Sequence, residues 1–309
     1  MASKQSEANK RHYETILAPG GQPMSPEEAT EWRDRQWTAL TAEPGGVDYV
    51  EVDAGGTKAM WLIPKACVED RVIFCVHGGG YIGGSIYTHR KMYAHLAKAA
   101  GCRGLVIDYD YVHQNIFPTQ LNQALTAYRW LLRQGVEAKR MAMIGDSCGA
   151  TILFGLLQRA RDEGLPQPAA AMSISAWTDL DATGVTYETN RAKDAFFTKE
   201  TTTWLARNIV GPGGDLRDPL ASPLYGDLKG FPPIFLQAGG DETLLDDSRM
   251  FAERAKAAGV EVRLDVFPEM LHSFQMMAGC APEADDAIGR LAEWVRPRLG
   301  LTDIGRKAA

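Results

Sequence analysis

Residues 141–160 read Met-Ala-Met-Ile-Gly-Asp-Ser-Cys-Gly-Ala-Thr-Ile-Leu-Phe-Gly-Leu-Leu-Gln-Arg-Ala. The first part is a short apolar run without helical spacing, which predicts a buried strand. The second part has the spacing of an amphipathic helix, with one apolar face made of Ile152, Leu153, Leu156, Leu157 and Ala160. Between them, Gly145 and Gly149 flank Ser147. A Gly-x-Ser-x-Gly turn from strand to helix is typical of a nucleophile elbow, which lifts the serine hydroxyl clear of the backbone. A plain Gly-Ser turn is the alternative.

The composition limits the possible classes of protein. With 309 residues, 45% of them hydrophobic, the chain can bury a large core. Its net charge of −6 is spread without long runs of one sign, which favours neither nucleic acid nor an anionic membrane as a partner. No apolar run has the length of a membrane span, and the N-terminus lacks the apolar stretch of a signal peptide. Five cysteines without metal-ligand spacing predict reduced thiols in the cytoplasm and no metal site.

Apolar strands alternate with amphipathic helices along the chain, which predicts a mostly parallel central sheet flanked by helices. Active residues are then expected at the carboxyl ends of the strands. A first pair of strands, 47–52 and 60–63, reads as a hairpin. A further helix is entered through Phe117-Pro118 and stops at Gly135. The remaining expected strands cover 71–76, 104–109, 169–174, 233–238 and 261–267, and the remaining helices cover 89–100, 247–258 and 283–298.

The first 45 residues predict two helices outside this pattern. Ser25, Pro26 and Glu28 carry the signature of a capped helix start. Trp32 and Trp37 on that helix indicate either ordinary packing against the main domain or part of a lid over a pocket.

A glycine-rich stretch, His77-Gly-Gly-Gly80, directly follows the strand 71–76. Gly78, Gly80 and Gly83 fit the dinucleotide-binding pattern, with Asp108 at the end of the next strand. Residues 84–88 separate the last glycine from the expected helix, however, and two strands precede the motif, which disfavours a nucleotide site. Glycines without Cβ atoms can instead aim two backbone N–H groups at one oxyanion, and the N–H of Cys148 would be the third donor.

A serine hydrolase of this chain order needs an acid and then a histidine after the elbow. Asp241 is the first acidic residue after the strand 233–238, and we expect it to be the acid; Asp246 is expected to cap the following helix instead. His272, the only histidine after the elbow, is expected to be the base.

Together these motifs resemble the bacterial hormone-sensitive-lipase-like esterases of the α/β-hydrolase superfamily, over residues 47–300. The resemblance rests on His77 to Gly80, Gly145 to Gly149, Asp241 before Leu244, His272 before Phe274, Ser222-Pro-Leu and Pro232-Pro-Ile. It implies an α/β-hydrolase fold with a helical cap and a triad of Ser147, Asp241 and His272. It also implies an oxyanion hole made by Gly79, Gly80 and Cys148, with Gly78 as a further possibility. No cofactor is implied.

The resemblance also implies a division of the chain into a cap, a catalytic domain and a tail. Residues 1–45 and 185–215 form the cap, residues 46–184 and 216–300 form the catalytic domain, and residues 301–309 form a tail. The insertion contains a helix capped by Thr198. Six side chains are candidates for the substrate pocket, although each could equally be core: Tyr81, Ile82, Trp177, Phe196, Phe197 and Leu271.

Three features depart from the family pattern. Cys148 replaces the usual alanine, Tyr109-Asp-Tyr-Val-His-Gln114 replaces Tyr-Arg-Leu-Ala-Pro-Glu, and Glu269 replaces a glycine, with Ser273 in place of the glycine of His-Gly-Phe. The changes around Glu269 and Ser273 resemble the subgroup that contains monoterpene lactone hydrolases.

The sequence therefore predicts a serine carboxylesterase acting on short- to medium-chain acyl esters, with water as second substrate. A hydrolase of ε-lactones is the alternative within the class. A ligand-binding homologue without activity and an NAD(P)-dependent oxidoreductase are the alternatives outside it. A homodimer is possible, but no residue requires one.

Overall fold

One sheet organises the part of the chain that the computed structural model describes, residues 2–17 and 25–301. Its eight strands follow the order β1-β2-β4-β3-β5-β6-β7-β8. β1 and β2 pair antiparallel, β2 also pairs antiparallel with β4, and the other neighbours are parallel. The strands are β1 (Val47–Asp53), β2 (Lys58–Pro64), β3 (Val68–Val76), β4 (Cys102–Ile107), β5 (Met141–Asp146), β6 (Ala170–Ile174), β7 (Ile234–Gly239) and β8 (Val262–Phe267). The predicted, mostly parallel sheet is confirmed.

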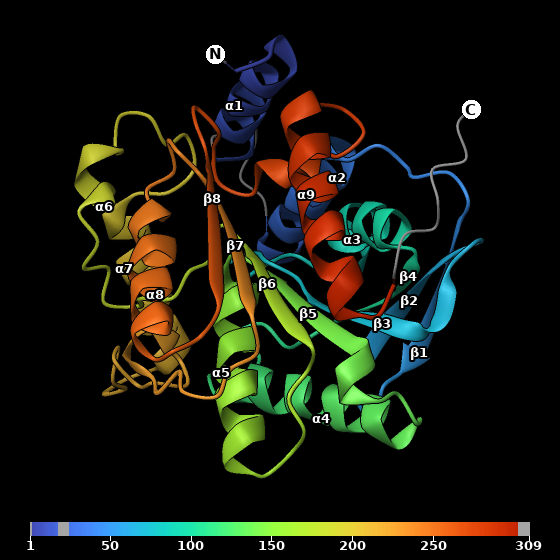
Figure 1. Ribbon diagram of the computed structural model, residues 1–309. Coiled ribbons are helices and arrows are strands. Elements are labelled where there is room, and N and C mark those ends of the chain that lie inside the picture. Colours follow the sequence, from blue (N-terminus) through green and yellow to red (C-terminus); the bar gives the residue numbers. More distant parts are fainter. Residues whose placement is uncertain (1, 18–24, 302–309) are drawn as a thin grey trace.

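Helices cover both faces of this sheet (Figure 1). On one face, α4 (Thr119–Arg133), α5 (Cys148–Asp162) and α8 (Leu245–Ala257) share a core that includes Leu121, Leu153 and Phe251. On the other, α3 (Ile86–Ala100) and α9 (Pro282–Arg298) share a second core that includes Met92 and Leu291. A parallel strand covered on both faces has no polar side, which explains why every residue of β5 is buried.

α3 begins three residues before the expected helix start at position 89. The Ser85 hydroxyl accepts hydrogen bonds from the backbone N–H groups of Tyr87 and Thr88, at 3.2 and 3.3 Å. The Thr88 hydroxyl accepts in return from the Ser85 N–H at 2.8 Å. Threonine here takes the reciprocal capping position that Glu or Gln usually holds, which the sequence pattern did not signal.

Two N-terminal helices, α1 (Lys4–Leu17) and α2 (Pro26–Leu40), pack above the carboxyl ends of the strands on the side of α3 and α9. The predicted capping box of Ser25 and Glu28 is present at the start of α2. α6 (Thr186–Thr189) and α7 (Lys199–Val210) lie in the insertion between β6 and β7, and Thr198 caps α7 as expected. Short 3-10 helices cover Ala138–Arg140, Pro223–Tyr225 and Phe274–Met277.

Candidate active site

Ser147 occupies a strained turn between β5 and α5. Its backbone φ of 53° and ψ of −122° lie where side chains other than glycine are rarely found. The turn is possible because α5 approaches β3 closely: a Cβ on Gly149 would lie 2.2 Å from the carbonyl oxygen of Val76. Local strain maintained by tight packing is the signature of a nucleophile elbow, so the predicted turn is confirmed.

His272 comes from the loop after β8 and meets the serine directly. Its Nε2 lies 2.9 Å from Ser147 Oγ. The loop is held from outside the main domain, because the hydroxyl of Tyr13 on α1 donates to the backbone carbonyl of His272 at 2.7 Å. Both His272 and Tyr13 are buried. The expected serine–histidine pair is thus assembled in the structure.

The carboxylate against His272 belongs to Glu242. Its Oε2 lies 3.0 Å from His272 Nδ1, and Oε1 accepts the N–H of Gly239 at 3.2 Å. The Ser175 hydroxyl also bonds to this carboxylate. Because an ionised carboxylate only accepts hydrogen bonds, Nδ1 of a neutral His272 donates to it, and Nε2 is left to accept the Ser147 hydroxyl.

Asp241, the acid expected from the sequence, does not contact His272, and this expectation is wrong in the structure. Its side chain is 25% exposed and pairs with Lys193 at 3.2 Å. After β7 the chain turns, and the N–H groups of Gly240 and Asp241 donate to the carbonyls of Phe267 and Met270, at 2.7 and 3.0 Å. This turn places Asp241 outward and directs the next, longer side chain, Glu242, to the imidazole.

Burial and the neighbouring negative charges have opposite effects on the pKa of His272. Burial, the largest effect, lowers the pKa of the imidazole, but the hydrogen bond and negative charge of Glu242, helped by Asp146 and Asp194, raise the pKa above 6.5 overall. Burial of Glu242 raises the pKa of its carboxyl, partly offset by the hydrogen bond and charge of His272. The raised pKa of His272 is what a general base near neutral pH requires.

The glycine loop after β3 faces Ser147, with Gly79 and Gly80 lining the cavity that also contains His272. A Cβ on Gly79 would lie 2.0 Å from the carbonyl oxygen of Gly83, so this close turn needs glycine. The N–H of Cys148 opens α5, where no preceding helical turn supplies an acceptor. These positions suit an oxyanion hole, which stays a proposal.

The amide of Gly78 is used elsewhere. It donates to Nε2 of His89 at 3.1 Å. His89 Nδ1 lies 2.8 Å from the Thr88 hydroxyl oxygen. Burial lowers the pKa of His89, partly offset by Asp146, which favours the neutral imidazole. The possible role of Gly78 as an oxyanion donor is therefore contradicted.

Asp146 connects the parts of the site. Its Oδ1 accepts from the Ser273 hydroxyl at 2.6 Å, next to the histidine, and its Oδ2 lies 3.2 Å from His89 Nε2, beneath the glycine loop. The residue preceding the nucleophile thus joins the serine turn to the histidine loop, and it also lies beside His89 of α3.

The segment after α6 is anchored beside Glu242. Asp194 Oδ1 accepts the N–H groups of Phe196 and Phe197 at 2.7 and 3.0 Å, and Oδ2 accepts the N–H of Thr243 at 2.7 Å, one residue after Glu242. The ring of Phe197 meets the His272 ring edge-on at a centroid distance of 4.7 Å. The insertion between β6 and β7 therefore has fixed contacts with the loops that carry Glu242 and His272.

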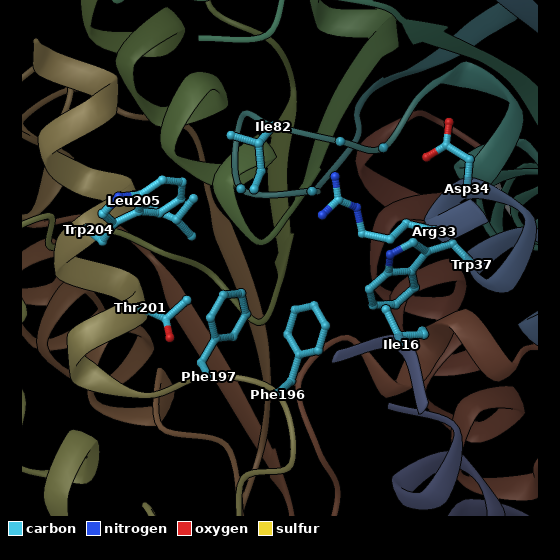
Figure 2. Close-up of a pocket in the computed structure, with 14 residues that line it drawn as sticks. Ile16, Arg33, Asp34, Trp37, Ile82, Phe196, Phe197, Thr201, Trp204 and Leu205 are labelled. Carbon is cyan, nitrogen blue, oxygen red and sulfur yellow. The ribbon is translucent and has the colours of Figure 1, made fainter. Parts of the chain in front are cut away.

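Two adjoining cavities open at the serine. The inner cavity contains Ser147 and His272, and the outer cavity encloses about 680 Å³, part of it open to solvent. Both are bordered by Trp37, Gly79, Gly80, Gly84, Phe196 and Phe197. Figure 2 shows the outer cavity, with α7 contributing Thr201, Trp204 and Leu205 and the N-terminal helices contributing Ile16, Arg33, Asp34 and Trp37.

Ile82, Phe196 and Phe197 line the outer cavity, as expected of pocket residues. Tyr81 and Trp177 are instead buried in the core of the α4–α5–α8 face, and Leu271 lines a different hollow beside Asp241 and Lys10. These three do not line the cavities at Ser147. Leu205 and Trp204 of α7 and Arg33 of α2 were not predicted, because helical spacing alone does not reveal which helix residues face a cavity.

The contacts of His77 stabilise the glycine loop. Its Nδ1 lies 2.7 Å from the carbonyl oxygen of Gly78, and its ring stacks on Tyr109 at a centroid distance of 4.1 Å. The Tyr109 hydroxyl also lies 3.5 Å from the buried thiol of Cys148. Cys148, which departs from the family pattern, thus meets Tyr109, the residue that precedes the altered stretch 110–114.

Neither a metal centre nor a membrane span is apparent in residues 2–17 and 25–301. No three His, Cys, Asp or Glu side chains gather there as metal ligands would. None of the helices in those ranges is long and apolar enough to cross a membrane.

Comparison with known proteins agrees with this fold. Residues 73–276 match the α/β hydrolase fold family. An acetyl-hydrolase of Streptomyces hygroscopicus is 36% identical over 261 residues, covering 84% of this chain and 85% of that protein. An ethyl acetate hydrolase of Pseudomonas putida is 31% identical over 234 residues, 72% of each chain. The crystal structure of an esterase from the bacterial hormone-sensitive lipase family superposes with a TM-score of 0.92 at 36% identity, covering 97% of this chain and 100% of that one.

Proposed function

Because the chain belongs to the α/β-hydrolase-fold family, as a carboxylic ester hydrolase of the bacterial hormone-sensitive lipase type, we propose that it cleaves short- to medium-chain acyl esters through an acyl-enzyme on Ser147. The observation that carries this proposal is the unbroken line of contacts from Ser147 Oγ to His272 Nε2, 2.9 Å, and from His272 Nδ1 to Glu242 Oε2, 3.0 Å.

In the acylation step, Ser147 Oγ attacks the ester carbonyl carbon while His272 Nε2 takes the hydroxyl proton. The negative charge of Glu242 stabilises the imidazolium that forms. The carbonyl oxygen becomes an oxyanion, which receives the N–H groups of Gly79, Gly80 and Cys148. The tetrahedral intermediate then breaks its bond to the alkoxy oxygen, and His272 returns the proton to the departing alcohol.

Deacylation repeats these steps with water. His272 removes a proton from the water as its oxygen attacks the acyl carbon, and the bond to Ser147 Oγ breaks with return of the proton to the serine. The products are a carboxylic acid and the free enzyme. This chemistry uses only protein groups and water.

We assign the cap to residues 1–45 and 185–215, with the catalytic domain formed by residues 46–184 and 216–300. The aromatic side chains of Tyr13, Trp37 and Phe196, which come from both cap segments, have ring centroids 5.4 Å apart in each pairing. The names of the two relatives, an acetyl-hydrolase and an ethyl acetate hydrolase, favour small acyl groups. Lactone hydrolysis, a homodimer and a cytoplasmic location stay predictions from the sequence.

The chain-length preference tests the proposed substrate class. On p-nitrophenyl esters from acetate to decanoate, kcat/KM should rise to butyrate or hexanoate, since each buried methylene contributes about 0.8 kcal/mol. For decanoate kcat/KM should be lower again, because this acyl chain is long enough to pass Trp204, which is 57% exposed at the cavity wall. An ε-lactone is assayed beside the series. Absence of turnover on every ester would contradict the proposal.

The pH dependence should follow His272, which acts as a base only when neutral. Because its pKa is raised above 6.5, the acid limb of kcat/KM should have its midpoint above pH 6.5, with activity lost as pH falls through it. A matched profile of Glu242→Gln should move the midpoint downward, since the carboxylate that favours the cation is gone. A wild-type midpoint below pH 6.5 would show that Glu242 does not control the base.

A further inference from the structure

The outer cavity contains one feature that simple acyl esters do not use. Its wall is mainly aromatic and aliphatic, with backbone of the glycine loop. Besides the Thr201 hydroxyl and the indoles of Trp37 and Trp204, its polar side chains are the consecutive residues Arg33 and Asp34 on α2. Neither residue has a step in ester hydrolysis, so their presence in the substrate space needs a separate explanation.

Arg33 and Asp34 point in different directions. In Figure 2 the guanidinium of Arg33 reaches into the space bordered by Ile82, Trp37 and Phe196, whereas the carboxylate of Asp34 is turned away from Phe196 and Phe197. The Asp34 carboxylate accepts a hydrogen bond from the backbone of Gly84, and its buried Oδ1 has no hydrogen-bond partner within the described residues. Asp34 therefore fastens α2 to the glycine loop, and Arg33 is the charged group presented to the cavity.

The Arg33 side chain is half-buried at this wall, and its guanidinium faces the space that a ligand would fill. A guanidinium carries several N–H donors in a planar fork, so contacts to the protein leave donors for a ligand. Its fork geometry matches a carboxylate, with which it forms paired hydrogen bonds.

We propose that Arg33 binds a carboxylate carried by the substrate, so that the preferred esters have an anionic group at the far end of the chain that enters the outer cavity. This inference rests on the proposed ester hydrolysis at Ser147. It names the substrate class as half-esters of dicarboxylic acids, or esters of hydroxy acids, depending on which side of the ester enters the cavity.

The test compares carbon-matched substrates by titrating the acid released. Monoethyl adipate is set against ethyl hexanoate for the acyl side, and 4-acetoxybutanoate against butyl acetate for the alcohol side. The wild type should favour the anionic member of one pair in kcat/KM. In Arg33→Met that anionic-to-neutral ratio should fall about tenfold to a hundredfold, mainly through KM, as expected for losing a charged hydrogen bond. Arg33→Lys should retain part of the preference for the anionic substrate.

Arg35→Met is the matched control, since Arg35 lies on the same helix with its side chain exposed. Its ratio should equal that of the wild type; an equal loss in both methionine variants would assign the effect to overall charge and overturn the proposal. A wild type without preference in either pair would also overturn it, while Ser147-dependent turnover of the neutral esters would leave the proposed function intact. Adipate should inhibit the wild type more strongly than hexanoate, a comparison that needs no variant.

Discussion

Replacing Glu242 with glutamine should lower kcat on p-nitrophenyl butyrate by about 10³–10⁴-fold, the scale seen when a triad acid becomes its amide. Glutamine keeps the length and fills the same buried space, so the loss isolates the charge. The amide cannot stabilise the imidazolium, and its NH₂ group can donate to Nδ1, which would place the proton of His272 on Nε2 and leave that nitrogen unable to accept from Ser147.

The matched variant is Asp241→Asn, one residue away. Asp241 is partly exposed and its ion pair with Lys193 joins two surface groups, so kcat should change by about fivefold or less. Thermal melting of both variants shows whether the fold is kept. If Asp241→Asn lost far more activity than Glu242→Gln, the acid would be Asp241 and the arrangement around His272 would have to differ in the working enzyme.

Ser147→Ala should remove about 10⁶-fold of kcat, the scale found when the nucleophile of a triad is deleted. His272→Ala should cost a similar amount, and the double variant should be scarcely worse than either, because the two residues act as one unit. Steady-state rates on purified variants, at high enzyme concentration, measure the residual turnover.

Ser173→Ala is the control for this series. Ser173 is a fully buried serine on β6, the strand beside β5, and its hydroxyl has no hydrogen-bond partner among the described residues. Its replacement removes the same kind of atom, a serine hydroxyl, from the strand next to β5 and should leave the rate close to that of the wild type. A Ser147→Ala enzyme that kept wild-type turnover would require another nucleophile.

The fold and two parts of the site could be predicted from the sequence because their signals are local. Gly145, Ser147 and Gly149 specify a turn by themselves, and His272 has no competing histidine after the elbow. The alternation of apolar strands with amphipathic helices is likewise a property of contiguous segments. These predictions required no knowledge of distant contacts.

The acid could not be predicted in the same way. Asp241 and Glu242 are adjacent acidic residues after one strand, and the choice between them depends on how Gly240 and Asp241 hydrogen-bond to the loop after β8. That pairing joins segments about thirty residues apart. Order along the chain favoured the first acid, whereas the direction of the turn and the extra methylene of glutamate favour the second.

The pocket residues could not be predicted from local sequence patterns either. Tyr81 and Trp177 are near the nucleophile in the fold, yet their side chains are buried in the core. The residues that line the outer cavity come from α1, α2, the glycine loop and the insertion, which meet only in the folded chain (Figure 2). Side-chain type therefore indicated pocket candidates, and only the packing of the helices selected among them.

The most direct test of the central claim is covalent labelling with a fluorophosphonate, followed by intact mass and peptide mapping. A nucleophile activated by His272 should take up one phosphonyl group, on Ser147, with loss of esterase activity in proportion to labelling. Peptide mapping also separates Ser147 from the adjacent thiol of Cys148. An adduct on any other residue, or an unmodified protein that still hydrolyses esters, would contradict the account.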